Sequence, residues 1–207
     1  MTNALSAQEA GGGASGAAPV TTRVKHPNSR LISPLWLGEG CDGLSALYAA
    51  INGIRLALAH EHCFTGPEIH CLMRAGLRFF EGRASPQQCV LNGVRVQLWR
   101  GLVEAMVEAT CQRTGIRLTS ERIHVHEHRC RDAVFSGLDG SLEAFRVPLI
   151  LLRGGIYTVV SGATPSSILL FDARGCCWIS KAACGVPGDG EGMRHLIYPP
   201  SFVALNL

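Results

Sequence analysis

The chain has 207 residues, of which 47% are hydrophobic and 17% are charged, a balance that suits one globular domain with a substantial core. The net charge is +3, and the lysines and arginines are scattered rather than grouped, which argues against nucleic-acid binding. No apolar run approaches the roughly 18 residues of a membrane span, so no membrane partner is expected. The first ten residues lack a basic start and a continuous apolar run, so we expect no signal peptide.

The nine cysteines form no Cys-x-x-Cys pair, and their number is odd. This pattern favours reduced, mostly buried thiols over a disulfide framework. We therefore expect a cytoplasmic protein.

The N-terminal part is rich in small residues. Ala, Gly, Ser and Thr dominate residues 1–22, and they cannot bury enough apolar surface to offset the entropy of ordering. We expect a disordered tail over residues 1–30 and one folded domain over residues 31–207.

Helices are predicted for the first half of the domain. Apolar residues recur at three- and four-residue steps over 43–60 and 95–113, as on the buried face of a helix. Between them, the Thr-x-x-Glu spacing of Thr65 and Glu68 is a capping box that predicts another helix start.

The second half changes to the two-residue period of strands. Residues 117–126 alternate like a strand, 130–145 is predicted as a helix, and the remainder is predicted as an antiparallel meander. Its strands are expected at 147–152, 156–161, 168–172, 176–180, 195–198 and 202–205. The predicted fold class is α+β, with N-terminal helices packed on a C-terminal antiparallel sheet.

The start of the first helix has the features of a nucleophile site without the nucleophile. Asp42 is a good N-cap residue, and Ser45 follows three residues later, where backbone N–H groups and the helix dipole favour a negative group. A cysteine there would have a lowered pKa. A serine needs a general base to react.

Residues 42–55 and the region 155–175 resemble motifs of the bacteriocin-leader-peptidase type of bacterial papain-like cysteine peptidase. Residues 42–55 read Asp-Gly-Leu-Ser-Ala-Leu-Tyr-Ala-Ala-Ile-Asn-Gly-Ile-Arg, similar to the family's Asp-Gly-x-Cys-Gly-x-Tyr-x-x-x-Asn-x-x-Arg. Residues 155–162 read Gly-Ile-Tyr-Thr-Val-Val-Ser-Gly, and residues 169–175 read Leu-Leu-Phe-Asp-Ala-Arg-Gly. They are similar to the family's Gly-His-Trp-x-Val-Val-x-Gly and Leu-x-x-Asp-Ser-x-Gly.

The resemblance implies a papain-like fold with altered catalytic positions. Ser45 stands in the place of the catalytic Cys, Ile156 in the place of the His, and Asp172 keeps the acid. We expect Ser45 to begin a buried helix and to lie close to the strand that carries Ile156. Because a serine without a base is a poor nucleophile, the resemblance predicts a non-catalytic protein that needs no cofactor.

In the resembled family the cleft accepts an extended peptide, so the expected partner is a polypeptide or protein. The predicted groove lies between the helix near Asp42 and Gly43 and the strand with Ile156 and Tyr157. Strand addition is one way in which such a groove holds a peptide.

Two other functions stay open. The first is an active cysteine or serine hydrolase that uses Cys41, just before the predicted cap, or Ser45 with a histidine from elsewhere. The second is metal binding, because imidazole and thiolate suit Zn²⁺ and alternate strand positions share a face. Its ligands would be His124, His126, His128 and Cys130.

Overall fold

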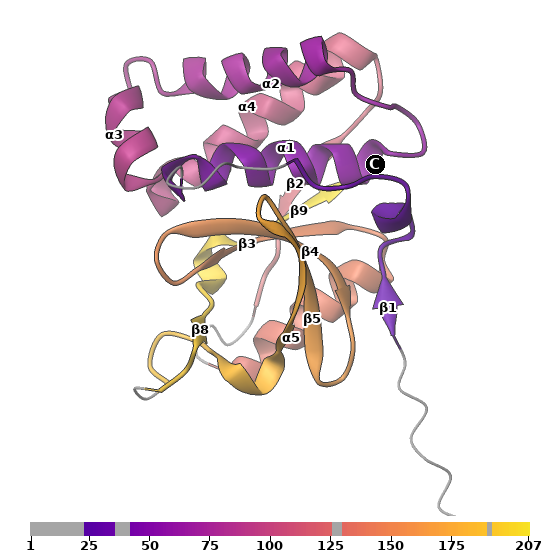
Figure 1. Ribbon diagram of the computed structural model, residues 1–207, viewed down its shortest axis with the longest axis vertical. Helices are drawn as coiled ribbons and strands as arrows, with labels where there is room; N and C mark the ends of the chain where they lie inside the picture. The colour runs from indigo at the N-terminus through magenta and orange to yellow at the C-terminus, as the bar shows by residue number, and fades with distance from the viewer. Residues whose placement is uncertain (1–22, 36–41, 126–129, 190–191) are drawn as a thin grey trace, which may run out of the picture.

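A mainly antiparallel sheet with helices on both faces organises the protein, as the computed structural model shows for residues 23–35, 42–125, 130–189 and 192–207. Helix α1 (Ser45–Leu58) lies between the sheet and the pair formed by α2 (Gly66–Phe79) and α4 (Val96–Thr114), whereas α5 (Arg131–Glu143) covers the other face (Figure 1). The predicted α+β class is confirmed.

The helices begin close to the positions that the sequence predicts. Thr65 and Glu68 form the expected capping box at the start of α2. One helix was missed: α3 (Pro86–Asn92) begins after Ser85, whose hydroxyl accepts a hydrogen bond from the N–H of Gln88 at 3.4 Å. With seven residues, α3 is too short to show a helical period.

The main sheet has the strand order β2-β9-β3-β4-β5-β6, and β1 pairs with β4. Three of its pairs, β3–β4, β4–β5 and β5–β6, are the hairpins expected of a meander. Strand β2 covers only four of the ten residues predicted as a strand. A separate parallel pair joins β7 to β8. The bounds are β1 Val24–Lys25, β2 Thr119–Arg122, β3 Val147–Leu152, β4 Ile156–Ala163, β5 Ser167–Asp172, β6 Gly175–Ser180, β7 Cys184–Gly185, β8 His195–Leu196 and β9 Val203–Asn206.

Two hydrophobic cores lie on the two faces of the sheet. Alternate residues of β4 point to opposite faces, so Tyr157 and Val159 join the core beneath α1 and α4, whereas Val160 joins the core beneath α5. Helix α1 is buried almost all round, with twelve of its fourteen residues inaccessible, as expected of a helix covered on both sides. Gly53 permits its close approach, because a Cβ there would lie 3.0 Å from Leu149.

The predicted N-terminal boundary is wrong. Val24–Lys25 pairs with β4 as β1, and Pro27–Arg30 forms a short 3-10 helix, so residues 24–30 belong to the folded domain rather than to a tail. The backbone groups of β4 at Gly162 and Ala163 fix this segment, which composition alone does not reveal. Residues 1–22 lie outside the described part of the chain.

The thiols are less buried than expected. Among the described cysteines, all of them free, Cys89 and Cys184 are buried, whereas Cys63, Cys176 and Cys177 are exposed. In the same part of the chain no helix combines the length and apolar character needed to cross a bilayer.

Candidate functional site

Ser45 is the first residue of α1 and sits directly against β4. Its side chain is 5% exposed. The hydroxyl donates a hydrogen bond to the carbonyl oxygen of Gly155 and accepts one from the N–H of Tyr157, each at 3.2 Å. These two residues flank Ile156, so the expected proximity of Ser45 to the strand carrying Ile156 is confirmed.

The position of Ser45 follows from where the β4–β5 ladder ends. The last pair of that ladder is Val159 with Phe171. Tyr157 lies two residues before Val159 in β4, so its N–H points to the same side as that of Val159 but has no β5 residue opposite it. A buried backbone N–H or C=O without a partner is costly. The Ser45 hydroxyl takes the place of the missing strand for the buried Tyr157 N–H, and it also bonds the carbonyl of the exposed Gly155.

The helix start differs from the predicted one. Residues Asp42–Leu44 form a 3-10 turn that leads into α1, and Leu44 rather than Asp42 is the cap residue, without a side-chain cap. The prediction of Asp42 as the N-cap is therefore wrong. Gly43 lies in the same turn and is half-buried.

Tyr157 does not line a groove, contrary to the prediction. Its side chain is 2% exposed, and its hydroxyl donates to the carbonyl oxygen of Val94 at 2.8 Å. Its ring packs on Trp99 with centroids 4.3 Å apart, and burial raises the pKa of the Tyr157 phenol. The two-residue period that puts Tyr157 beneath α1 and α4 removes it from any surface.

Ile156 and Asp172 lie together, on the sheet face opposite to Tyr157. Half-buried Ile156 packs against the core beneath α5. Asp172 is 8% exposed, and its Oδ1 accepts a hydrogen bond from the backbone N–H of Arg174 at 2.9 Å. Its carboxylate also lies 3.7 Å from the Arg174 Nε. Asp172 therefore closes the β5–β6 turn, as an Asp at such a turn commonly does.

A pocket of about 370 Å³ opens beside these two residues. Its apolar wall comes from β3, β4, β5 and β6, and its rim carries arginines from turns and loops that are distant in sequence. The lining residues include Leu152, Arg153, Ile156, Leu170, Asp172, Arg174, Cys177, Ile179, Arg194 and His195. Sequence reasoning missed this arginine pocket because only the folding of the sheet brings its arginines together.

The pocket contains the residue types of a cysteine hydrolase without their geometry. Within the described residues no hydrogen bond joins Cys177, His195 and Asp172 to one another. Burial, followed by the Asp172 carboxylate, raises the pKa of the Cys177 thiol, which opposes formation of the thiolate. Burial and the neighbouring Arg194 lower the pKa of His195.

The remaining predicted sites are only partly described. Cys41, His126 and His128 lie outside the described residues. His124 is exposed, and Cys130 directly precedes α5. Among the described residues, no group of three or more His, Cys, Asp or Glu side chains could hold a metal ion.

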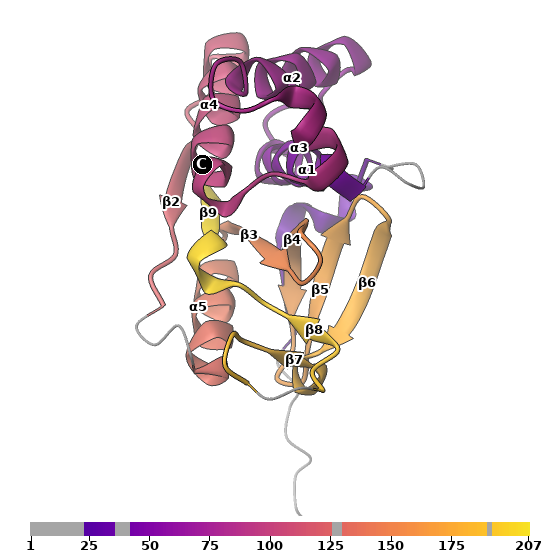
Figure 2. The same ribbon diagram turned by 90° about the vertical axis from the view of Figure 1, so that its left-hand side faces the viewer.

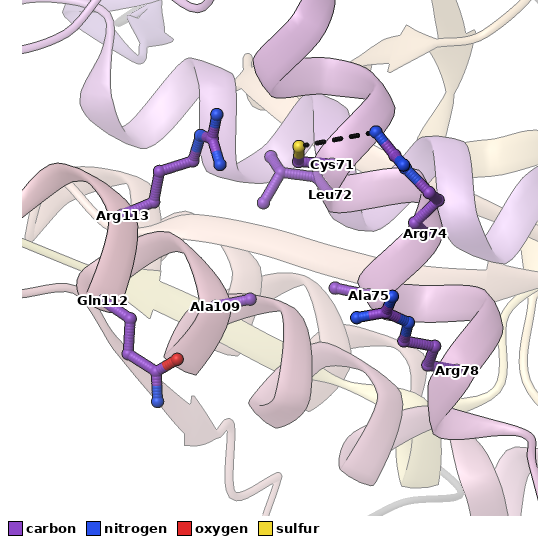
Figure 3. A pocket seen from close by; sticks show the side chains of 8 residues that line it. All are labelled: Cys71, Leu72, Arg74, Ala75, Arg78, Ala109, Gln112 and Arg113. Atoms are coloured by element: carbon purple, nitrogen blue, oxygen red, sulfur yellow. Dashed lines mark hydrogen bonds between the residues drawn. The ribbon is translucent and has the colours of Figure 1, made fainter.

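A second cationic pocket, of about 430 Å³, lies between α2 and α4. Arg74 and Arg78 of α2 face Gln112 and Arg113 of α4 across a floor that includes Leu72 (Figure 3). No acidic side chain lines it among the described residues. It lies on the outer side of the helical layer, away from Ser45 and Ile156.

No protein-family model matches the chain, and no curated protein matches its sequence. The likeness of the motifs around Ser45, Ile156 and Asp172 to papain-like peptidases therefore remains an expectation from the sequence.

Proposed function

We propose that this protein is a non-catalytic relative of papain-like peptidases that binds an extended polypeptide segment. The observation that carries the proposal is the double hydrogen bond of the Ser45 hydroxyl to Gly155 and Tyr157. In the resembled family, a reactive thiol occupies this position. Here a serine uses its hydroxyl to hold two elements of the fold together.

The chemistry around Ser45 opposes catalysis. A serine hydroxyl reacts only when a base removes its proton, and among the described residues no histidine forms a hydrogen bond with Ser45. Its proton is directed to a carbonyl oxygen, which is not a base. At 5% exposure, the oxygen is also poorly accessible to a substrate.

The binding part of the proposal has two supports. The first is the resemblance itself, since the family accepts extended peptides. The second is the topology, because no described strand pairs with the outer side of β6, and such an edge offers backbone hydrogen bonds to a further strand.

A labelling experiment tests the non-catalytic part. The full-length protein is incubated with a fluorophosphonate, which modifies activated serines, and separately with an epoxysuccinyl peptide, which modifies catalytic cysteines. We expect no adduct at Ser45 or Cys41 by intact mass and peptide mapping, as in the matched Ser45→Ala variant. An adduct at either residue that disappears on denaturation would show an active hydrolase.

A selection experiment tests the binding part. A displayed library of random peptides is selected against the immobilised protein and against bare support. We expect sequences rich in β-branched residues, which prefer the extended conformation, to be enriched on the protein alone. Equal recovery from both surfaces would contradict peptide binding.

A further inference from the structure

Strand β6 forms one edge of the main sheet. It pairs with β5 on one side, and among the described residues no strand pairs with its other side (Figure 2). The direction of its backbone groups follows from the hydrogen bond of the Lys181 N–H to the Ser166 carbonyl at 2.8 Å. Because the direction alternates along a strand, Cys177 and Ile179 also bond toward β5, whereas Cys176 and Trp178 direct their N–H and C=O groups outward.

This edge lacks the usual protection against strand addition. Natural edge strands carry charged residues, proline or a bulge that discourages pairing. Strand β6 reads Gly-Cys-Cys-Trp-Ile-Ser over Gly175–Ser180 and pairs with β5 in continuous register. It has no charge and no proline, and residues 176–178 are exposed.

The two faces of β6 present different surfaces to a neighbouring strand. Cys177 and Ile179 line the arginine pocket, and Cys176 contributes to its wall at the start of the strand. Trp178 lies on the other face with 38% of its surface exposed, and the Arg23 guanidinium sits 4.7 Å from its ring centroid. A strand added beside β6 would therefore place alternate side chains over the pocket.

The charge of the pocket selects one kind of side chain. Arg153, Arg174 and Arg194 line it, and among the described lining residues Asp172 is the only acidic one. Asp172 is already held by the turn and lies close to Arg174. Guanidinium groups bind carboxylates through paired N–H donors, so Arg153 and Arg194 suit an incoming carboxylate.

We propose that the outer edge of β6 binds an extended segment of a partner protein, and that an acidic side chain of this segment enters the arginine pocket. The proposal rests on the proposed function, because it names the surface and the chemistry of the polypeptide partner. Backbone bonds to Cys176 and Trp178 hold the segment, and the pocket selects its charge.

The test uses two fluorescent peptides of about eight residues, the length of a typical strand. Both alternate Val and Thr, and they differ only in a central Glu or Lys that faces the pocket. Fluorescence anisotropy with the full-length protein should show binding of the Glu peptide, weaker by about tenfold or more for the Lys peptide because of like-charge repulsion. Equal affinities, or no binding of the Glu peptide, would overturn the proposal.

A pair of substitutions at one position tests the backbone contact. Cys176→Pro removes the outward N–H, which an edge strand tolerates, whereas Cys176→Ala keeps it. We expect loss of peptide binding in the first variant and retained binding in the second, which shortens only a side chain at the pocket wall. If Cys176→Pro fails to fold, amide exchange of Cys176 and Trp178 in the wild type replaces it, and both amides should slow when the Glu peptide is added. Binding without either effect contradicts strand addition.

The charge is tested by Arg194→Glu, with Arg117→Glu as the matched control, since both arginines are exposed and only Arg194 lines the pocket. Arg194→Glu leaves two arginines against two carboxylates in the pocket and should remove the preference between the two peptides, whereas Arg117→Glu should leave it unchanged. Equal effects of both variants would exclude the pocket.

A dimer that Cys176→Pro dissociates in sedimentation would show that a second copy of the chain occupies the edge. Labelling of Ser45 with intact peptide binding would refute only the non-catalytic function.

Discussion

The junction of Ser45 with β4 and the outer edge of β6 present the same problem to the fold, and they differ in how it is solved. In both places a strand directs backbone groups beyond the end or the edge of its ladder. At β4, the Ser45 hydroxyl bonds these groups and the site is closed. At β6, the outward groups of Cys176 and Trp178 have no strand beside them among the described residues.

The difference separates the structural junction at Ser45 from the surface that we propose for binding. The junction at Ser45, the motif position of the nucleophile, is buried, bonded and packed against β4. The edge at β6 has exposed backbone, an exposed tryptophan and a cationic pocket, which also contains the motif positions Ile156 and Asp172. The following predictions contrast these two regions, beginning with the largest effect.

The two tryptophans provide the strongest contrast. Trp99 is 1% exposed, packs on Tyr157 and donates its Nε1–H to the Ser201 carbonyl at 2.9 Å. Trp99→Ala should lower the free energy of unfolding by about 3–5 kcal/mol, because it leaves a large cavity. Trp178→Ala, at the open edge, should cost less than about 1 kcal/mol. Urea denaturation measures both changes. Similar losses of unfolding free energy in the two variants would contradict the contrast between the buried junction and the open edge.

Ser45→Ala tests the closed junction itself. The variant leaves the buried N–H of Tyr157 and the C=O of Gly155 without their partner, which should cost about 1–3 kcal/mol in unfolding free energy. Ser136→Ala, on the exposed face of α5, is the control and should change stability by less than about 0.5 kcal/mol. Peptide binding at β6 should be the same in both variants, and a stable Ser45→Ala protein would remove the structural role.

Asp172 has a smaller expected effect. Asp172→Ala removes the acceptor for the Arg174 N–H and should cost about 1 kcal/mol. Asp172→Asn keeps an acceptor oxygen and should remain within about 0.5 kcal/mol of the wild type. Denaturation curves of the two variants distinguish the acceptor oxygen from the negative charge. If the charge were required, Asp172→Asn would lower the free energy of unfolding as much as Asp172→Ala.

The smallest expected effect is a pH dependence of stability that comes from a buried histidine, His26. His26 is 3% exposed, its Nδ1 accepts the Asn28 N–H at 3.3 Å, and its Nε2 donates to the Phe145 carbonyl at 3.1 Å. Burial lowers the pKa of His26 below its ordinary value of 6.5. The unfolded chain then binds more protons near that pH, so stability is complete above pH 6.5 and decreases as the pH falls below it.

Denaturation at a series of pH values checks this sign. The His26→Asn variant should be less stable at neutral pH and should show a flatter decline below pH 6.5. An equally steep decline in the variant would assign the effect to other groups, among them His195, whose pKa burial and Arg194 also lower.

Much of the fold could be predicted because long elements carry their own period. The helix that begins at Ser45 and the hairpins around Arg153 and Arg174 follow directly from apolar spacing and turn residues. The short α3 and the strand at Val24–Lys25 could not be predicted, since neither is long enough to show a period and β1 depends on a partner far along the chain.

The candidate site divides in the same way. The motifs correctly indicate that Ser45 lies next to the strand of Ile156, because one motif covers the start of α1 and the other the start of β4. They give no sign that Tyr157 is buried, which depends on the face of β4 that α1 and α4 cover. Nor do they mark Arg153 and Arg194, which become neighbours only through the packing of β3, β6 and β8.

Hydrogen exchange of individual backbone amides tests the central contrast most directly. In the free protein, the amide of Tyr157 should exchange only through global unfolding, because Ser45 accepts its hydrogen bond in a buried site. The amides of Cys176 and Trp178 should exchange rapidly and become protected when the acidic peptide is added. Rapid exchange at Tyr157, or protection of Cys176 and Trp178 in the free protein, would contradict the account.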